Sequence, residues 1–313
     1  MIELQNITKR YGDKYAVQDV SFTIRKGEIL GFLGRNGAGK STTMNIVTGY
    51  VSATEGSVLI DGLDIVDEPR AAKRKIGYLP EQPPLYMDMT VDEYLRFVCA
   101  IKEVSHRQIS RHVDELCELV KIADHKKRLI KNMSKGYRQR VGMAQALAGN
   151  PDVVIMDEPT VGFDPMQIIE IRKLIKELGA NHSIVLSSHI LHEIEDICER
   201  VVIIHKGKIV AQDTLEGLAR GMDKGAGLHV RIAGPEDKIR EAVGKMEGVE
   251  ALEPMPIQEA GCVDIALRSG WKTDLRRPLF EAMSHLGYPI LLMRPMGTDL
   301  ESVFLQVTQE AEV

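Results

Sequence analysis

The pattern of apolar and polar positions divides most of the chain into short buried strands and longer amphipathic helices. Apolar runs that are too short for a helix stand at 28–33, 153–157, 183–188 and 201–205. Apolar side chains recur at the spacing of one helix face in residues 41–48, 137–148, 166–179 and 192–198. Apolar strands that alternate with helices predict an α/β fold with a mostly parallel sheet covered on both faces.

The other elements of the first 220 residues fit the same picture. Two alternating runs within 2–29 are interrupted by the turn-rich residues Tyr11–Lys14, which predicts a hairpin. Short strands are also expected at 56–62 and 76–80. Residues 91–123 are predicted to be helical, with apolar positions on two faces. We therefore predict one α/β domain over residues 1–220, which contains a helical subdomain at about 88–150.

The pattern changes at a glycine-rich stretch, residues 221–227, which we interpret as a linker. Beyond it the expected elements follow the order strand, helix, strand, strand, helix, strand. This order suggests a small ferredoxin-like α+β accessory domain over residues 228–313, with a last helix at 298–307. No cluster of side chains in this half of the chain points to a chemical reaction.

Composition excludes several classes of protein. The chain has 313 residues, of which 44% are hydrophobic and 27% charged, and its net charge is −5, so no positive field is expected to attract nucleic acid. Its four cysteines lie far apart without metal-type spacing, which favours reduced thiols in the cytosol. The first residues enter a strand directly, which leaves no room for a signal peptide. No apolar run approaches the roughly 20 residues that cross a bilayer, so any membrane span is expected to come from another subunit.

Residues Gly34–Ser41 carry the strongest chemical signal in the sequence. They read Gly-Arg-Asn-Gly-Ala-Gly-Lys-Ser and fit the phosphate-binding loop G-x-x-x-x-G-K-[ST]. The glycines allow backbone N–H groups to converge on phosphate oxygens, Lys40 can reach the terminal phosphates, and the Ser41 hydroxyl can coordinate Mg²⁺. The flanking strand and helix place this loop at a helix N-terminus, where an anion is stabilised.

Polar side chains that could complete a phosphoryl-transfer site follow other predicted strands. Asp157 ends a buried strand and could hold Mg²⁺, and Glu158 could orient and deprotonate the attacking water. Ligands of open α/β sheets bind at such strand ends, which favours a site over a simple charge cluster at a turn. His189 ends a further strand. Taken alone, His189 could be a helix cap and Gln82 a solvated loop amide.

The order of these residues resembles the ATP-binding subunit of ABC transporters over residues 1–219. The resemblance makes Tyr11 the aromatic that stacks on adenine, Gln82 the Q-loop glutamine, Gly162–Asp164 the D-loop and His189 the switch histidine. It implies a nucleotide site for ATP that consists of Tyr11, Asn36, Gly37, Ala38, Gly39, Lys40, Ser41 and Thr42, with Ser134 and Gly136 from a second copy. It also implies that Glu158, His189, Gln82 and Lys40 are catalytic and that Ser41, Gln82 and Asp157 serve Mg²⁺.

Two motifs depart from the usual form of this family. The signature motif, usually Leu-Ser-Gly-Gly-Gln, reads Met133-Ser134-Lys135-Gly136-Tyr137 here, and the D-loop reads Val161–Asp164 in place of Ser-Ala-Leu-Asp. The helix that starts at the signature still offers a hydroxyl, backbone amides and a positive dipole end. This Ser-Lys-Gly-Tyr-Arg-Gln-Arg form resembles a branch of ATP subunits that serve ABC-2 type exporters, including those of gliding motility and of sodium or drug efflux.

The resemblance implies an ATPase that works as a head-to-tail dimer and powers an ABC-2 type permease from the cytoplasmic face of the membrane. A groove for a permease helix is then expected along Pro83–Met89 and the helical residues beyond. Two alternatives stay open: a soluble ABC-type ATPase that acts on ribosomes or DNA, and an ATPase that is gated by a ligand of the C-terminal domain. A single phosphate loop and the absence of a heptad arm weigh against the first alternative.

Overall fold

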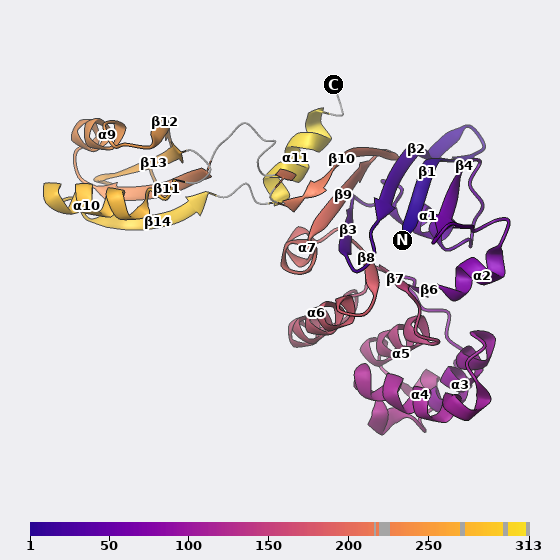
Figure 1. Cartoon of the computed structure of the whole chain (residues 1–313). Helices are drawn as coiled ribbons and strands as arrows, with labels where there is room; N and C mark the ends of the chain where they lie inside the picture. The colour runs from indigo at the N-terminus through magenta and orange to yellow at the C-terminus, as the bar shows by residue number, and fades with distance from the viewer. Residues whose placement is uncertain (216, 219–225, 270–272, 297–299, 311–313) are drawn as a thin grey trace. The chain divides into compact units, whose positions relative to one another are not determined.

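The chain folds into two compact units, each with its own apolar core (Figure 1). The computed structural model describes residues 1–215, 217–218, 226–269, 273–296 and 300–310. The first unit ends at Thr214. The sequence analysis places the domain boundary slightly later, at residue 220. None of the helices in the described ranges is both long and apolar enough to cross a membrane.

A six-stranded sheet in the order β10-β9-β3-β8-β7-β6 is the centre of the first unit. Its strands are β3 (Ile29–Leu33), β6 (Ile76–Leu79), β7 (Val153–Asp157), β8 (Ser183–Ser188), β9 (Arg200–His205) and β10 (Lys208–Thr214). All but β10 are parallel, which confirms the predicted α/β fold. The sequence analysis missed β10, because this edge strand is half exposed and has no buried alternation.

A second, antiparallel sheet packs on the first through apolar side chains. Its order is β2-β1-β4-β5, with bounds β1 (Ile2–Tyr11), β2 (Lys14–Ile24), β4 (Glu55–Ile60) and β5 (Leu63–Asp64). The hairpin predicted at Tyr11–Lys14 is confirmed as the turn between β1 and β2. Phe22 of β2 stacks on Phe32 of β3 with ring centroids 5.3 Å apart, within one core shared by both sheets. The predicted parallel sheet is therefore only one of two.

Seven α-helices surround or extend these sheets within residues 1–214. They are α1 (Lys40–Val47), α2 (Pro69–Arg74), α3 (Val91–Ile101), α4 (His106–Leu119), α5 (Lys135–Leu147), α6 (Pro165–Gly179) and α7 (Leu191–Ile197). The range expected to be helical, 91–123, divides into two helices, because the left-handed backbone of Glu103 (φ +58°) separates α3 from α4. Helices α3, α4 and α5 contact one another as a helical group (Figure 1).

The second unit contains a four-stranded antiparallel sheet in the order β12-β13-β11-β14. Its elements are β11 (Ala226–Ala233), α9 (Glu236–Gly244), β12 (Val249–Pro254), β13 (Cys262–Ser269), α10 (Arg276–Leu286), β14 (Ile290–Met296) and α11 (Leu300–Glu310). Strand β11 starts inside the expected linker, whose residues 221–225 lie outside the described residues. The last helix extends to Glu310 rather than 307, and positions 298–299 of the expected helix also lie outside them.

Candidate functional site

The phosphate loop connects β3 to α1 at the carboxyl edge of the parallel sheet. Gly39 has φ +111° and a Cβ there would lie 2.7 Å from the Ala16 carbonyl oxygen, so this position requires glycine. A Cβ on Gly34 would lie 2.7 Å from the Ile204 carbonyl oxygen, because the loop passes close to β9. Asn36 and Gly37 are exposed, whereas Ala38 and Lys40 are buried. The sequence therefore forms an open loop whose lysine points into the protein.

Lys40, Glu158 and His189 form one continuous row of charged or titratable groups. Lys40 Nζ donates a hydrogen bond to the Gly34 carbonyl oxygen at 2.7 Å and lies 3.6 Å from Oε1 of Glu158. The other carboxylate oxygen of Glu158 lies 2.8 Å from Nδ1 of His189. These residues follow β3, β7 and β8, which are neighbours in the sheet. The Glu158 carboxylate therefore joins the phosphate loop to the expected switch histidine.

Asp157 and Ser41 offer the oxygen atoms that Mg²⁺ prefers. Asp157 is the last residue of β7, is almost fully buried, and accepts a hydrogen bond from Ser187 Oγ. Ser41 is exposed in the first turn of α1. Mg²⁺ is usually held by one or two carboxylates together with phosphate oxygens, so this donor set fits the ion. Ser187, which fixes the Asp157 carboxylate, was not identified by the sequence analysis.

The backbone of Glu158 is in the left-handed region, with φ +49°. Its N–H donates to the Ser187 carbonyl oxygen at 3.0 Å, which extends the pairing of β7 with β8 by one residue. A non-glycine residue in this region costs of order 1–3 kcal/mol and is maintained only when its surroundings hold it. Such strain is common at functional sites, and here it directs the Glu158 side chain toward Lys40 and His189.

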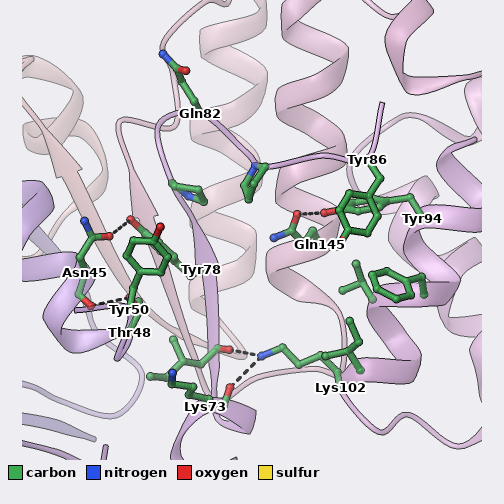
Figure 2. Close-up of a pocket in the computed structure, with 16 residues that line it drawn as sticks. Asn45, Thr48, Tyr50, Lys73, Tyr78, Gln82, Tyr86, Tyr94, Lys102 and Gln145 are labelled. Carbon is green, nitrogen blue, oxygen red and sulfur yellow. Dashed lines mark hydrogen bonds between the residues drawn. The ribbon is translucent and has the colours of Figure 1, made fainter. Parts of the chain in front are cut away.

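Among the described residues, no contact joins Tyr11 or Gln82 to this row. Tyr11 ends β1, has a half-exposed ring, and lies under the ammonium of Lys9 at 5.2 Å. Gln82 is exposed, and Figure 2 shows its amide directed away from the other labelled side chains. Within the described part of the chain, Gln82 has no hydrogen bond to Asp157 or Glu158. The adenine contact of Tyr11 and the Mg²⁺ contact of Gln82 therefore stay predictions.

The expected signature residues cap and pack helix α5. Ser134 is its N-cap, and its hydroxyl oxygen accepts a hydrogen bond from the Tyr137 N–H at 3.4 Å. Gly136 is buried, and a Cβ there would lie 3.3 Å from the ring of Phe163. The signature and the D-loop of one chain are thus packed together. Of the described contacts, none joins Ser134 to the phosphate loop of its own chain.

Comparison with known proteins assigns the family. The sequence profile of the ABC transporter family matches residues 17–161. The linearmycin resistance ATP-binding protein LnrL of Bacillus subtilis is 31% identical over 309 residues, which cover 98% of each chain. The chain belongs to the ABC transporter ATP-binding proteins. A further relative, the ABC transporter ATP-binding protein NatA of B. subtilis, is 35% identical to this ABC ATPase over 70% of this chain and 91% of NatA.

Solved structures agree with this assignment. The structure of an ATP-binding subunit of an ABC transporter matches this ABC ATPase with a TM-score of 0.66 and 31% identity, over 71% of this chain. A dimeric post-hydrolysis structure of the ATP-binding cassette MJ0796 bound to ADP and phosphate matches with a TM-score of 0.64, 28% identity and 69% coverage. The chain is accordingly an ATP-binding protein that hydrolyses ATP, as the sequence analysis predicted.

Proposed function

We propose that this ABC ATPase is the motor subunit of an ABC-2 type exporter and works as a head-to-tail dimer on the cytoplasmic face of the membrane. Its relatives include the linearmycin resistance protein LnrL, matched over nearly the whole chain, and the bacitracin transport ATP-binding protein BcrA of Bacillus licheniformis, which is 36% identical over 222 residues. Both names concern antibiotics, which favours export over import for this chain. The contacts of Glu158 with Lys40 and with His189 are the main support for the catalytic part of the proposal.

Each residue of the row has a distinct task in hydrolysis. The ammonium of Lys40 stabilises charge on the terminal phosphates, and the loop amides and the N-terminus of α1 hold the phosphate oxygens. Glu158 accepts a proton from the attacking water, and His189, at 2.8 Å from its carboxylate, fixes the orientation of that carboxylate. Ser41 and Asp157 would hold bound Mg²⁺, which would neutralise negative charge on the phosphates.

Half of the nucleotide site has to come from a second copy of the chain. The hydroxyl of Ser134 and the N-terminus of α5 are suited to a phosphate, yet they pack beside the D-loop rather than beside Lys40. In a dimer in which each signature faces the partner's phosphate loop, both halves of each nucleotide site are present. The MJ0796 cassette, which resembles this chain, has been solved as a dimer, and this supports the proposed arrangement.

A groove of about 720 Å³ in the first unit is suited to a helix of the permease (Figure 2). One wall consists of Tyr86 and the α3 residues Tyr94 and Phe97, and the opposite wall includes Tyr50 and Tyr78. The rings of Tyr86 and Phe97 are 5.4 Å apart and those of Tyr86 and Tyr94 are 5.9 Å apart, which gives a continuous aromatic surface. Pro84 and Tyr86 belong to the segment where the sequence analysis expects this groove.

Charge at the groove indicates what kind of helix it accepts. Lys73 and Lys102 lie at one end, and none of the described residues that line the groove is acidic. Both ammonium groups donate to backbone carbonyls, Lys73 to Gly49 at 2.9 Å and Lys102 to Ile76 at 2.6 Å, so their positions are fixed. We therefore propose a short helix with apolar side chains along its length and a carboxylate near the two lysines.

Co-expression with a polytopic membrane protein encoded next to this chain tests the proposal. The wild-type chain is expected to co-purify with that protein in detergent, and Phe97→Asp should abolish co-purification while the isolated ATPase keeps its basal activity. Val66→Asp is the control, because Val66 is also an exposed apolar residue but does not line the groove. A chain that never associates with membranes and has no such neighbour contradicts the exporter, and an unaffected Phe97→Asp variant contradicts the groove.

A further inference from the structure

Glu193 is a buried carboxylate behind the catalytic row, and the chemistry described above does not use it. It lies in α7, four residues after His189, and is 1% exposed. Its Oε2 accepts a hydrogen bond from the Thr160 hydroxyl at 2.9 Å and a longer one from the Ser188 hydroxyl at 3.4 Å. A buried carboxylate without such partners would be strongly destabilising, so this position has a specific set of contacts.

The two hydroxyls belong to the two segments that carry the catalytic pair. Thr160 follows Glu158 by two residues, and Ser188 immediately precedes His189. The Ser188 hydroxyl oxygen also accepts a hydrogen bond from the Ile190 N–H at 3.0 Å, which fixes the chain on the far side of His189. One carboxylate therefore ties both segments together beside the 2.8 Å contact between Glu158 and His189.

The turn that begins at Glu158 needs this support. Glu158 has a positive φ of 49°, and the Val161 N–H donates to its carbonyl oxygen at 3.2 Å, which closes the turn. The Ser187 carbonyl holds the start of the turn through the Glu158 N–H, and the contact between Thr160 and Glu193 holds its second half. Strained conformations persist only when such contacts determine them from several sides.

Arg172 of α6 supplies positive charge to Glu193 and also provides a control. One guanidinium nitrogen lies 3.7 Å from Oε1 of Glu193, and another lies 2.7 Å from the Asp196 carboxylate. The Asp196 side chain is 58% exposed and contacts this arginine from the outer side of α7. Asp196 thus shares the helix and the ion-pair partner of Glu193 but lacks its two hydroxyl contacts.

We propose that Glu193 is a positioning residue for ATP hydrolysis. By binding Thr160 and Ser188 it keeps the strained Glu158 turn and the segment of His189 at the distance at which Glu158 faces the attacking water. Glu193 touches neither nucleotide nor water in this role. Its loss should therefore impair the catalytic step and leave ATP binding intact.

Steady-state kinetics of full-length variants test this role. Thr160→Val and Glu193→Ala are expected to lower kcat by about 10- to 100-fold, the range for a small misplacement of catalytic groups, and to change KM for ATP by less than about twofold. Glu193→Gln should retain most of the activity, because its amide oxygen still accepts the Thr160 hydroxyl. The double variant Thr160→Val/Glu193→Ala should be no worse than the poorer single variant, because both single variants remove the same contact between Thr160 and Glu193.

Asp196→Asn controls for a general effect of α7 and should keep the parental kcat. The proposal is overturned if Thr160→Val keeps the parental kcat, or if Thr160→Val and Glu193→Ala raise KM without lowering kcat. It is also overturned if the losses in kcat of these two variants multiply in the double variant. An equal loss in Asp196→Asn also overturns it, because the effect would then belong to the helix as a whole. Thr160→Val removes only one hydroxyl, so it provides a folded variant even if Glu193→Ala does not fold.

Discussion

Replacement of Glu158 by glutamine separates the catalytic step from nucleotide binding. Glutamine has the size of glutamate and can keep a hydrogen bond to His189, but it cannot accept a proton from water. Loss of a general base lowers rates by about 10²- to 10⁴-fold. At about 1.36 kcal/mol per tenfold change, the barrier to hydrolysis should rise by about 2.7–5.4 kcal/mol.

ATP affinity should not fall in the same variant. The Glu158 carboxylate lies 3.6 Å from Lys40 in a nearly water-free setting, so it places a negative charge beside the bound phosphates. Its neutralisation removes repulsion toward ATP and frees the ammonium for the phosphates. We therefore expect a dissociation constant equal to or below that of the parent, and an ATP-bound dimer that persists because hydrolysis no longer opens it.

Phosphate release measures the first effect, and gel filtration with and without ATP measures the second. Glu177→Gln makes the same chemical change on an exposed side chain of α6, near Lys173 and away from the catalytic row, so it should behave like the parent. Hydrolysis by Glu158→Gln at the parental rate would remove Glu158 from the role of base. A loss of ATP binding would instead show that Glu158 holds the nucleotide site together.

Three further predictions concern binding, packing and the thiols. Lys40→Ala should weaken ATP binding at least tenfold in isothermal titration, because it removes the cation of the phosphate loop; unchanged affinity would contradict this. Gly77→Ala should lower the free energy of unfolding by about 1–3 kcal/mol in urea titration, because its Cβ would lie 1.8 Å from the Ala146 carbonyl oxygen; unchanged stability would contradict that packing. Burial raises the pKa of Cys99 and Cys117 to about 11, so a thiol reagent at pH 8 should label them slowly until urea unfolds the chain, and rapid labelling would contradict the burial.

The parts of the structure that sequence reasoning found are those with a strong local signal. The phosphate loop has a fixed spacing, and Gly39 at φ +111° explains why only glycine serves there. The five parallel strands are short, and β3, β7 and β8 are buried along their whole length, so their apolar runs identify them without knowledge of their neighbours. The helix start at Ser134 follows from an N-cap residue before an amphipathic run.

Features that depend on distant neighbours were not accessible in this way. The link from Thr160 to Glu193 joins residues 33 positions apart, and no local pattern distinguishes Glu193 from an exposed helix glutamate. The left-handed backbone of Glu158 is imposed by its neighbours and not by its own preference. The break after α3 at Glu103 was also not predictable, because glutamate is a good helix former and its left-handed backbone is not a local preference.

The row Lys40–Glu158–His189 has a consequence for the stability of the central sheet. Lys40 begins the helix that follows β3, and Glu158 and His189 come directly after β7 and β8, the two neighbouring strands. A nucleotide bound there would join the segments that follow three neighbouring strands of the sheet. Ligand that binds only the folded form adds about 2.7 kcal/mol at a hundredfold excess over its dissociation constant. ATP should therefore stabilise the folded first unit in addition to being its substrate, and it should slow amide exchange in all three strands.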